Sequence, residues 1–593
     1  MYFKHIKCGQ LALGSIHYCL CALFLLLCTA CVKESEFLRL DLEENGGLEL
    51  PEGFEAIAVV NGLEGNARHL AVRDNGDIYV KLRLPDEKGG NAVLRDRNGD
   101  GIADKIKVFG KYPIHGKYGT GMRIHQDYLY FSSQTTVYRQ KLRPGKMLPE
   151  EKMEVVLQDD LGKALREHIA KPIAFDDAGH FYIPFGAPSN ACQEPKRTPL
   201  APGQDPCPQL ENFAGVWRFD LDKLDQRQAD GVRVASGIRS LVGLTWNPVD
   251  KELYAVIHGR DDLLRLFPDR YSPWQSALLP SEEFVRITQG SNYGWPYCYY
   301  DQMSQQKVLS PEYGGDGEII GRCSTYNKPL IGFPGHWAPN DILFYQGDQF
   351  PARYKNGAFI AFHGSTNRTP YPQSGYFVGF VPFEGGEPVG TWEVFADGFA
   401  RVDTIINVTD AVFRPMGLAE GPDGSLYISD TEKGAIWRVS YTGSREDFGE
   451  ADLAQMVANK ERLHIRTPDV ARDRLEQPAE GRGALTYKTF CATCHQSNGK
   501  GDGTRFPPLD GAEWVLGDKT RLIQLTLQGI AEPIEVKGQT YTGVMPQHAF
   551  LSDVEIADVL TFIRSNFGND ASAITSEEVA SVRKVLTEAT STD

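Results

Sequence analysis

The run CATCH at residues 491–495 contains the side chains best suited to chemistry in this sequence. The thiols of Cys491 and Cys494 have the spacing that adds to the two vinyl groups of a haem, and the adjoining His495 supplies the proximal iron ligand. The same spacing occurs in zinc and redox sites, but export signals and a second axial ligand downstream favour haem. The sequence therefore predicts covalently bound haem c.

A candidate for the second axial ligand, Met545 in GVMPQHAF, follows about fifty residues later. A thioether ligand raises the reduction potential of a haem, which suits an electron acceptor. His548 is the alternative ligand, and a methionine that only fills the core is the non-functional interpretation. The order CATCH, GKGDGTRFPPLDG, VMP and a C-terminal helix resembles a class I cytochrome c over about residues 480–569.

The segment DRNGDGIAD carries oxygen ligands at the spacing of the first nine positions of an EF-hand loop. These ligands are Asp96, Asn98, Asp100 and Asp104. Gly101 permits the sharp turn, but Lys107 stands where the last glutamate is expected. We expect a structural calcium loop in a hairpin, with a metal-free acidic turn as the alternative.

The amino-acid composition indicates the kind of fold that positions these residues. The 593 residues include 60 Gly and 35 Pro, which favours many short strands joined by turns before residue 445. The formal net charge of −16 leaves no basic surplus to neutralise phosphates, which argues against a nucleic-acid partner.

The N-terminus has the layout of an export signal. Lys4 and Lys7 precede an apolar stretch over residues 11–27, and small residues then lead to Cys31. LLLCTAC resembles a bacterial lipobox, with Cys28 at a position that is usually aliphatic. We expect lipidation of Cys31 and a periplasmic or cell-envelope location; an uncleaved anchor is the alternative.

Four of the eleven cysteines lie outside the export segment and CATCH: Cys192, Cys207, Cys298 and Cys323. In an oxidising compartment they suggest two disulfides. Of the three possible connectivities we favour the one that consists of two local pairs, 192 with 207 and 298 with 323, because both pairs close short loops. Free buried thiols are the alternative.

A strand and turn pattern recurs six times before residue 445. The copies are AVRDNGDIYV, RIHQDYLYFSS, AFDDAGHFYIPFG, TWNPVDKELYAVIHG, RYKNGAFIAFHG and AEGPDGSLYISD. Six such hairpins predict an all-β six-bladed propeller, whose radial repetition protects strand edges. A helical pattern and a polar stretch follow, ahead of a small all-α cytochrome c domain.

These signals divide the chain into six parts. The parts are a lipoprotein-type signal peptide (1–30), a tether (31–47), the propeller (48–445), a helical and polar linker (446–479), the cytochrome c domain (480–569) and a C-terminal tail (570–593).

An ordered set of segments resembles the soluble quinoprotein sugar dehydrogenases, in particular their sorbosone and pyranose dehydrogenase branch. The segments are REHIAKPIAFDDAGHFYIPFGAPSNAC, SGIRSLVGLTWNP, AVIHGRDDL, GSNYGWPYCYYD, AFIAFHGSTNR and FRPMGLAEGPDGSLYISD, within about residues 50–445. The resemblance implies a six-bladed propeller that binds pyrroloquinoline quinone (PQQ) and calcium on its axis.

The resemblance places His168 at the position of the general base. An imidazole near neutral pKa can take the substrate's hydroxyl proton as a hydride leaves the carbon. Lys171 and Pro172 depart from the family, which usually has an arginine there. A structural histidine before an apolar strand is the alternative.

The resemblance also implies cofactor-binding arginines. Arg239 matches a cofactor contact, with Ser240 where asparagine is common. Arg368 corresponds to a cation beside the quinone oxygens, and Arg414 to an arginine that pairs with a cofactor carboxylate. Met416 replaces a second arginine found in some members. Surface ion pairs are the alternative for each arginine.

The backbone carbonyls of Gly259 and Arg260 in HGRDD match the family's two calcium ligands, which are suitable hard oxygen donors. His258 beside them belongs either to the site or to a packed strand. The resemblance thus predicts oxidation of an aldose or sugar aldehyde, with electrons passed through haem c to a downstream cytochrome or respiratory chain. A calcium-dependent hydrolase or lactonase, or a carbohydrate-binding propeller, each with an attached cytochrome, are the alternatives.

Overall fold

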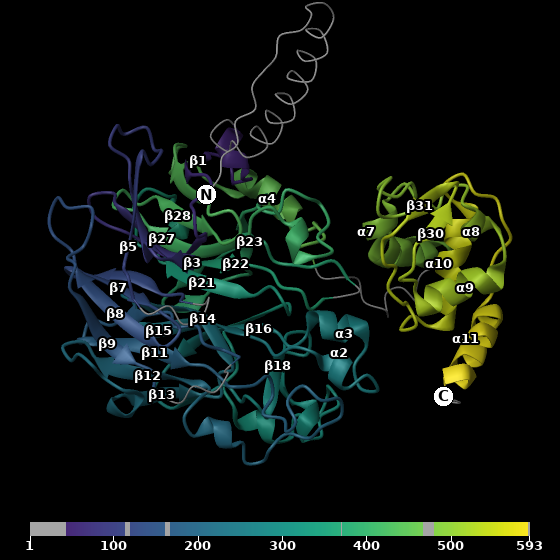
Figure 1. The fold of residues 1–593 in the computed structure, drawn as a ribbon, viewed down its shortest axis with the longest axis horizontal. Helices are drawn as coiled ribbons and strands as arrows, with labels where there is room; N and C mark the ends of the chain where they lie inside the picture. The colour runs from purple at the N-terminus through teal and green to yellow at the C-terminus, as the bar shows by residue number, and fades with distance from the viewer. Residues whose placement is uncertain (1–42, 113–118, 161–166, 369–370, 467–478, 591–593) are drawn as a thin grey trace, which may run out of the picture.

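The computed structural model describes residues 43–112, 119–160, 167–368, 371–466 and 479–590. A ring of β-sheets and a smaller helical domain lie beside each other (Figure 1). The predicted export segment with Cys31 lies outside the described residues. No helix in the described ranges has the length and apolar character needed to cross a bilayer.

Six antiparallel sheets form the blades of a propeller, so the predicted fold class is confirmed. The first strands of neighbouring sheets contact one another, as β2 does with β27 and β6, which places the first strands around the axis. These inner strands, for blades 1 to 6, are β2 (Ala67–Val72), β6 (Met122–His125), β10 (Ala174–Phe175), β14 (Ser240–Asn247), β21 (Pro339–Phe344) and β27 (Pro415–Glu420).

The outer strands follow in chain order in the first five blades. They are β3 (Ile78–Asp86), β4 (Gly89–Arg95) and β5 (Lys105–Phe109); β7 (Tyr128–Ser132), β8 (Thr136–Lys141) and β9 (Met153–Gln158); β11 (His180–Phe185), β12 (Gly215–Asp220) and β13 (Val232–Ser236); β15 (Glu252–His258), β16 (Glu282–Ile287) and β20 (Ile331–Phe333); β22 (Ala358–Phe362), β23 (Phe377–Val381) and β26 (Glu393–Ala396).

Blade 6 joins the two ends of the propeller. Its β28 (Leu426–Asp430) and β29 (Ile436–Tyr441) are completed by the N-terminal strand β1 (Phe54–Val60), with Phe54 opposite Tyr441. Phe54 also packs against Phe350 and Phe395, with ring centroids 4.8 and 5.1 Å apart. Burying one such ring stabilises the fold by about 1.5–3 kcal/mol, so the closure of the ring is held by core packing as well as by strand pairing.

Each repeat found in the sequence lies at the hairpin between the two innermost strands of one blade. In blade 1, β2 ends at Val72 and β3 begins at Ile78, with Gly76 in the turn at a φ of 82°. The Gly76 amide donates to the Arg73 carbonyl at 2.8 Å. Glycine adopts this left-handed conformation without strain, which explains why the turn motif is visible in the sequence.

Long insertions in blades 3 and 4 carry both predicted disulfides, Cys192–Cys207 and Cys298–Cys323, which the structure confirms. The minor elements of these insertions are β17 (Ser291–Asn292), β18 (Cys298–Asp301), β19 (Gln306–Leu309), α2 (Leu263–Leu266) and α3 (Pro273–Leu278). A small pair, β24 (Phe383–Glu384) and β25 (Glu387–Pro388), extends blade 5.

The predicted helical segment after the propeller packs on blades 5 and 6. It contains η9 (Glu450–Leu453) and α4 (Ala454–Asn459), and Met456 is buried in the core of blade 5. Arg462 donates to Glu49 at 2.8 Å, and His464 bonds Asp397 at 2.9 Å. The segment up to residue 466 is therefore attached to the propeller.

The C-terminal domain is helical, as predicted. Its elements are α6 (Ala479–Thr486), η10 (Tyr487–Cys491), α7 (Ala492–His495), α8 (Glu513–Leu516), α9 (Lys519–Gln528), β30 (Ile534–Val536), β31 (Gln539–Tyr541), α10 (Asp553–Ser565) and α11 (Ser576–Thr590). Ser552 caps α10, whose Ile556 and Leu560 are buried. α11 lies within the predicted C-terminal tail, and its Val579 is buried in the core of the helical domain.

Candidate functional site

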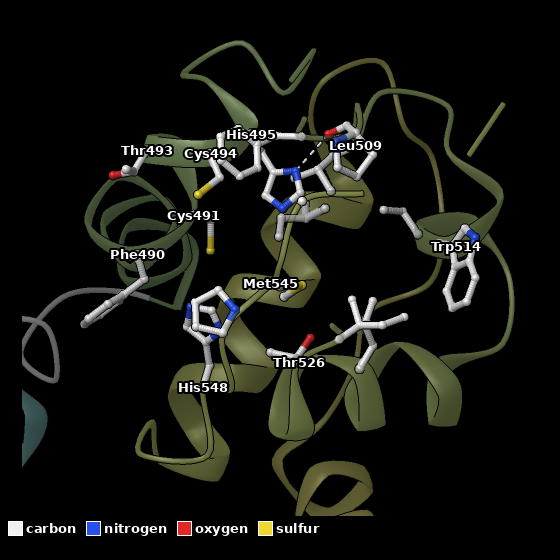
Figure 2. Close-up of a pocket in the computed structure, with 18 of the residues that line it drawn as sticks. Phe490, Cys491, Thr493, Cys494, His495, Leu509, Trp514, Thr526, Met545 and His548 are labelled. Carbon is white, nitrogen blue, oxygen red and sulfur yellow. Dashed lines mark hydrogen bonds between the residues drawn. The ribbon is translucent and has the colours of Figure 1, made fainter. Parts of the chain in front are cut away.

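The cytochrome motif surrounds a cavity of about 370 Å³ in the helical domain. Cys491 and Cys494 line this haem cavity, and both thiols are free and partly exposed. The Nδ1 of His495 bonds the Pro507 carbonyl at 2.9 Å, which fixes the ring and leaves Nε2 as the nitrogen able to ligate a metal (Figure 2). The three predicted haem-attaching residues are thus brought together in the arrangement that haem c requires.

Met545 lies across the haem cavity from His495 (Figure 2). Its backbone is held by two hydrogen bonds with Ile530, both 2.9 Å long. His548 also lines the cavity and is buried, and loss of hydration lowers its pKa to about 4. Cavity, thiols and both candidate ligands fit a haem, and Met545 stays the predicted axial ligand with His548 as the alternative.

A second group of functional side chains lies at one end of the innermost strands of the propeller. In an antiparallel hairpin, the start of the first strand lies beside the end of the second strand, as in the pairing of Ser240 with His258. Arg239 precedes β14, and Asp261 follows β15 of the same blade. We define the propeller site as His168, Arg239, Asp261, His336 and Arg368.

His168 is held by the backbone of blade 3. Its Nδ1 bonds the Ala187 carbonyl at 2.8 Å, so the hydrogen is on Nδ1 and Nε2 can accept a proton. A Cβ on Gly186 would lie 2.5 Å from the His168 carbonyl oxygen, which explains the glycine there. Desolvation and the charge of Arg239 keep the pKa of His168 well below its ordinary value, so the imidazole is neutral.

Arg239 forms the centre of the charge network and is linked to His168 through Ala187, whose amide donates to the Arg239 carbonyl at 2.8 Å. Its guanidinium donates to Asp261 and to the Gly259 carbonyl, both at 2.6 Å. Burial opposes ionisation of Asp261, but the charges of Arg239 and Arg197 hold its pKa well below its usual range. Ser240 is buried at the start of β14, beside this network.

Arg368 is only 1% exposed, and its Nε and Nη1 have no hydrogen-bond partner among the described residues. Burial lowers the pKa of this guanidinium to about 10, so it stays charged at neutral pH. The charges of Asp261, Arg368 and Arg239 all act on the pKa of His336, which burial lowers from its ordinary value. Buried donors without partners are rare and indicate a site for an anion.

Arg414 differs from Arg368 because all three of its guanidinium nitrogens have protein partners. It donates to the carbonyls of Gly364 and His363 at 2.6 and 3.1 Å, and its Nη1 lies 3.5 Å from Glu432. This network ties blade 6 to the end of β22. In this geometry the guanidinium nitrogens of Arg414 are therefore engaged by protein partners.

The Gly259 carbonyl, one of the predicted calcium ligands, accepts a hydrogen bond from Arg239 in this geometry, and both calcium sites stay predictions. A calcium ion on the Gly259 carbonyl would face the Arg239 guanidinium bonded to that oxygen, and the Arg260 side chain is buried in an ion pair with Glu312. No group of three or more His, Cys, Asp or Glu in the described ranges is arranged to hold a metal ion.

The loop over residues 96–104 is held by hydrogen bonds of its own side chains, and its binding of calcium stays a prediction. The Asp96 carboxylate accepts the amides of Gly99 and Gly101 at 2.7 and 2.8 Å, and Asp100 accepts from the Asn98 side chain at 2.8 Å. Asp104 pairs with Arg97 at 3.0 Å. The carboxylates are satisfied by the loop itself and do not converge on one point.

Two residues of the propeller site, Asp261 and His336, and the neighbouring Asn367 were not identified from the sequence. Asp261 lies in the motif HGRDD, and Asn367, which donates to Asp261 at 2.8 Å, lies in HGSTNR, so both motifs were signals that could have been read further. His336, whose Nε2 bonds the Ser276 carbonyl at 2.8 Å, has no such signal.

Comparisons with known proteins agree with both parts of the architecture. A family model described as TrAA12-like matches residues 48–442, and a cytochrome c model matches residues 481–567. The first match covers well over half of the chain. The chain belongs to the TrAA12-like family. It is a propeller of the sugar dehydrogenase type fused to a cytochrome c domain that carries haem c, as the resemblance implied.

Relatives of this TrAA12-like chain match its two parts separately. Cytochrome c-552 from Thermus thermophilus is 44% identical over 115 residues, which are 18% of this chain and 76% of that protein. The pyrroloquinoline quinone-dependent sugar dehydrogenase of Hypocrea jecorina is 25% identical over 240 residues, 37% of this chain and 51% of the relative. The chain thus spans about half the length of that relative.

Among solved structures, the holo form of the pyranose dehydrogenase PQQ domain from Coprinopsis cinerea has a TM-score of 0.52 and 18% identity. The match covers 66% of this chain and 97% of that domain. At this identity the likeness establishes the propeller fold alone.

Proposed function

We propose that the propeller oxidises an aldose or a sugar aldehyde with PQQ as the electron acceptor, and that the electrons pass to haem c. The buried guanidinium of Arg368 is the main support. An orphaned cation in a site that also holds a neutral histidine fits an anionic redox cofactor, because PQQ carries carboxylates and quinone oxygens. The unpartnered Nε of Arg239 fits the same group.

PQQ, when bound, supplies an acceptor for a hydride, and haem c supplies a one-electron carrier. The chain's own residues orient the substrate and move its proton. His168 takes the hydroxyl proton at Nε2 as the substrate carbon loses a hydride, so the sugar is oxidised by two electrons. Asp261 fixes the Arg239 guanidinium, which keeps one cationic group stationary in the site.

We also propose export and attachment to a membrane through lipidated Cys31, which lies outside the described residues. The electrons then leave haem c for a cytochrome or a respiratory chain, and tethering keeps donor and acceptor at high effective concentration.

The test is to load the haem-containing protein with PQQ, with and without calcium, add a panel of aldoses and sugar aldehydes, and follow the haem absorption. Sugar-dependent haem reduction that requires PQQ is expected. No reduction with any sugar, while PQQ is bound, would overturn the proposal. Hydrolysis of a lactone or ester in the same samples would instead support the hydrolase.

A further inference from the structure

The haem cavity has walls from both domains. Cys491, His495 and Met545 come from the helical domain, whereas Tyr371, Pro372 and Ile406 come from loops of the propeller. A class I cytochrome c fold is expected to enclose its haem with its own chain. Here the propeller supplies part of the enclosure.

The contact between the domains is aromatic and buried. The rings of Tyr371 and Phe490 lie 4.9 Å apart at the centroids, and Phe490 directly precedes the haem-attaching Cys491. The two side chains are only 3 and 6% exposed. Ala277 of α3 belongs to the same buried cluster, and Trp274 packs against it. Removing a buried aromatic pair costs packing beyond the area it covers.

A charged pair lies at the margin of this contact. Arg505, which lines the haem cavity, is 3.9 Å from Asp410 of the propeller. The Asp410 carboxylate also accepts the amides of Ile406 and Asn407 at 3.1 and 2.9 Å, so it belongs to the loop that forms the wall. An exposed pair of this kind adds little affinity but favours one orientation of the two surfaces.

The propeller wall is joined to the propeller site. The Tyr371 amide donates to the Arg368 carbonyl at 2.8 Å, so a backbone hydrogen bond joins the buried arginine to the residue whose ring contacts Phe490. On the opposite side, Ser276 of α3 accepts a hydrogen bond from His336 at 2.8 Å. The contacts that Tyr371 and α3 make with the helical domain are therefore both adjacent to residues of the propeller site.

We infer that the propeller completes the haem pocket, with Tyr371 and Ile406 closing the side of the haem next to Phe490. Small haem ligands then reach the iron only when this interdomain contact opens. The closure requires haem c but neither PQQ nor sugar. Its use for passing electrons between the domains rests on the proposed function.

The test measures imidazole binding to the oxidised haem of the full chain, without PQQ or sugar, by stopped-flow absorption. Tyr371→Ser should bind imidazole about tenfold faster, because losing about 1.4 kcal/mol of contact raises the open population by that factor. Tyr371→Phe keeps the ring and should bind at the wild-type rate. Met545→Ala, with a vacant axial position, gives the upper limit of the rate.

Arg505→Glu is a second variant, and it should not impair folding because the arginine side chain is 62% exposed. Repulsion from Asp410 should speed imidazole binding about threefold at low salt, and less at high salt. Lys500→Glu, an exposed residue of the same domain, is the matched control and should have no effect. Wild-type rates in both Tyr371→Ser and Arg505→Glu, with unchanged thermal unfolding, would overturn the inference. Failure of sugar oxidation would leave it untouched.

Discussion

The haem cavity takes its thiols and predicted iron ligands from two short segments, CATCH and the segment around Met545, whereas the propeller site combines residues of blades 3, 4 and 5. The first needs one helical turn and one facing loop. The second exists only when the ring of sheets is closed. A covalent cofactor can therefore be held by local geometry, but a charged cofactor site depends on the whole fold.

The two sites also differ in their electrostatics. Apolar side chains such as Leu522 and Ile563 form much of the haem cavity. The propeller site buries Arg239 and Arg368 beside the half-buried Asp261, together with histidines that stay neutral. Burying charges without full pairing costs stability, so this site is expected to trade stability for binding. The following predictions test that contrast.

The largest effect is expected from Cys491→Ala combined with Cys494→Ala. Covalent haem should be lost completely, while the unfolding temperature of the propeller stays unchanged, because the cores of its blades contain neither residue. Haem staining after denaturing electrophoresis and a thermal scan measure the two outcomes.

The reciprocal change removes Cys192–Cys207, whose partners are 15 residues apart. It should cost the propeller about 3 kcal/mol and leave the haem attached. Loss of haem from this variant would contradict the independence of the two sites.

His168→Gln should lower sugar-dependent haem reduction by about 100- to 10,000-fold, the range expected for a lost general base. PQQ binding should persist, since glutamine can still donate to the Ala187 carbonyl. His180→Gln is the control, because that histidine lies at the other end of blade 3 and bonds Asp176 at 2.9 Å. Equal turnover in both variants would remove His168 from the mechanism.

Acid should destabilise the propeller through its buried neutral histidines. Burial lowers the pKa of His69 to about 4, against an ordinary value of 6.5. The unfolded chain binds this proton first, so the free energy of unfolding falls as the pH drops below about 6.5, by about 2 kcal/mol at pH 5 from this residue.

Urea unfolding at pH 7.5 and pH 5, followed by tryptophan fluorescence, measures this change. His69→Asn keeps a donor for the Asn340 carbonyl and should reduce the pH dependence. An unchanged pH dependence in the variant would assign the acid effect to other groups.

The smallest effect is expected from Arg368→Met. Affinity for PQQ should fall about tenfold with the loss of a charge-assisted contact, whereas the unfolding midpoint of the cofactor-free protein should rise because an unpaired buried charge is removed. Titration calorimetry and thermal scans measure these opposite changes.

Arg438→Met, which breaks an outer ion pair with Asp423, should instead leave PQQ affinity unchanged without stabilising the protein. A stability loss and unchanged affinity in Arg368→Met would show that this arginine is structural.

The sequence alone was sufficient for features that depend on neighbouring residues. CATCH predicts haem c because the thiols and the imidazole lie within one helical turn. The six turn motifs predict six blades because each turn forms locally, and two short loops predict the disulfides. His168, Arg239 and Arg368 were found through the family resemblance.

Tertiary structure decided which groups are free to act. Arg368 and Arg414 read alike in the sequence, yet burial leaves Nε and Nη1 of the first without partners while His363 and Gly364 accept from the second. His336 and the wall formed by Tyr371 likewise depend on segments far apart in the chain. Hydrogen-bond partners and desolvation are properties of the packed fold, so no local pattern encodes them.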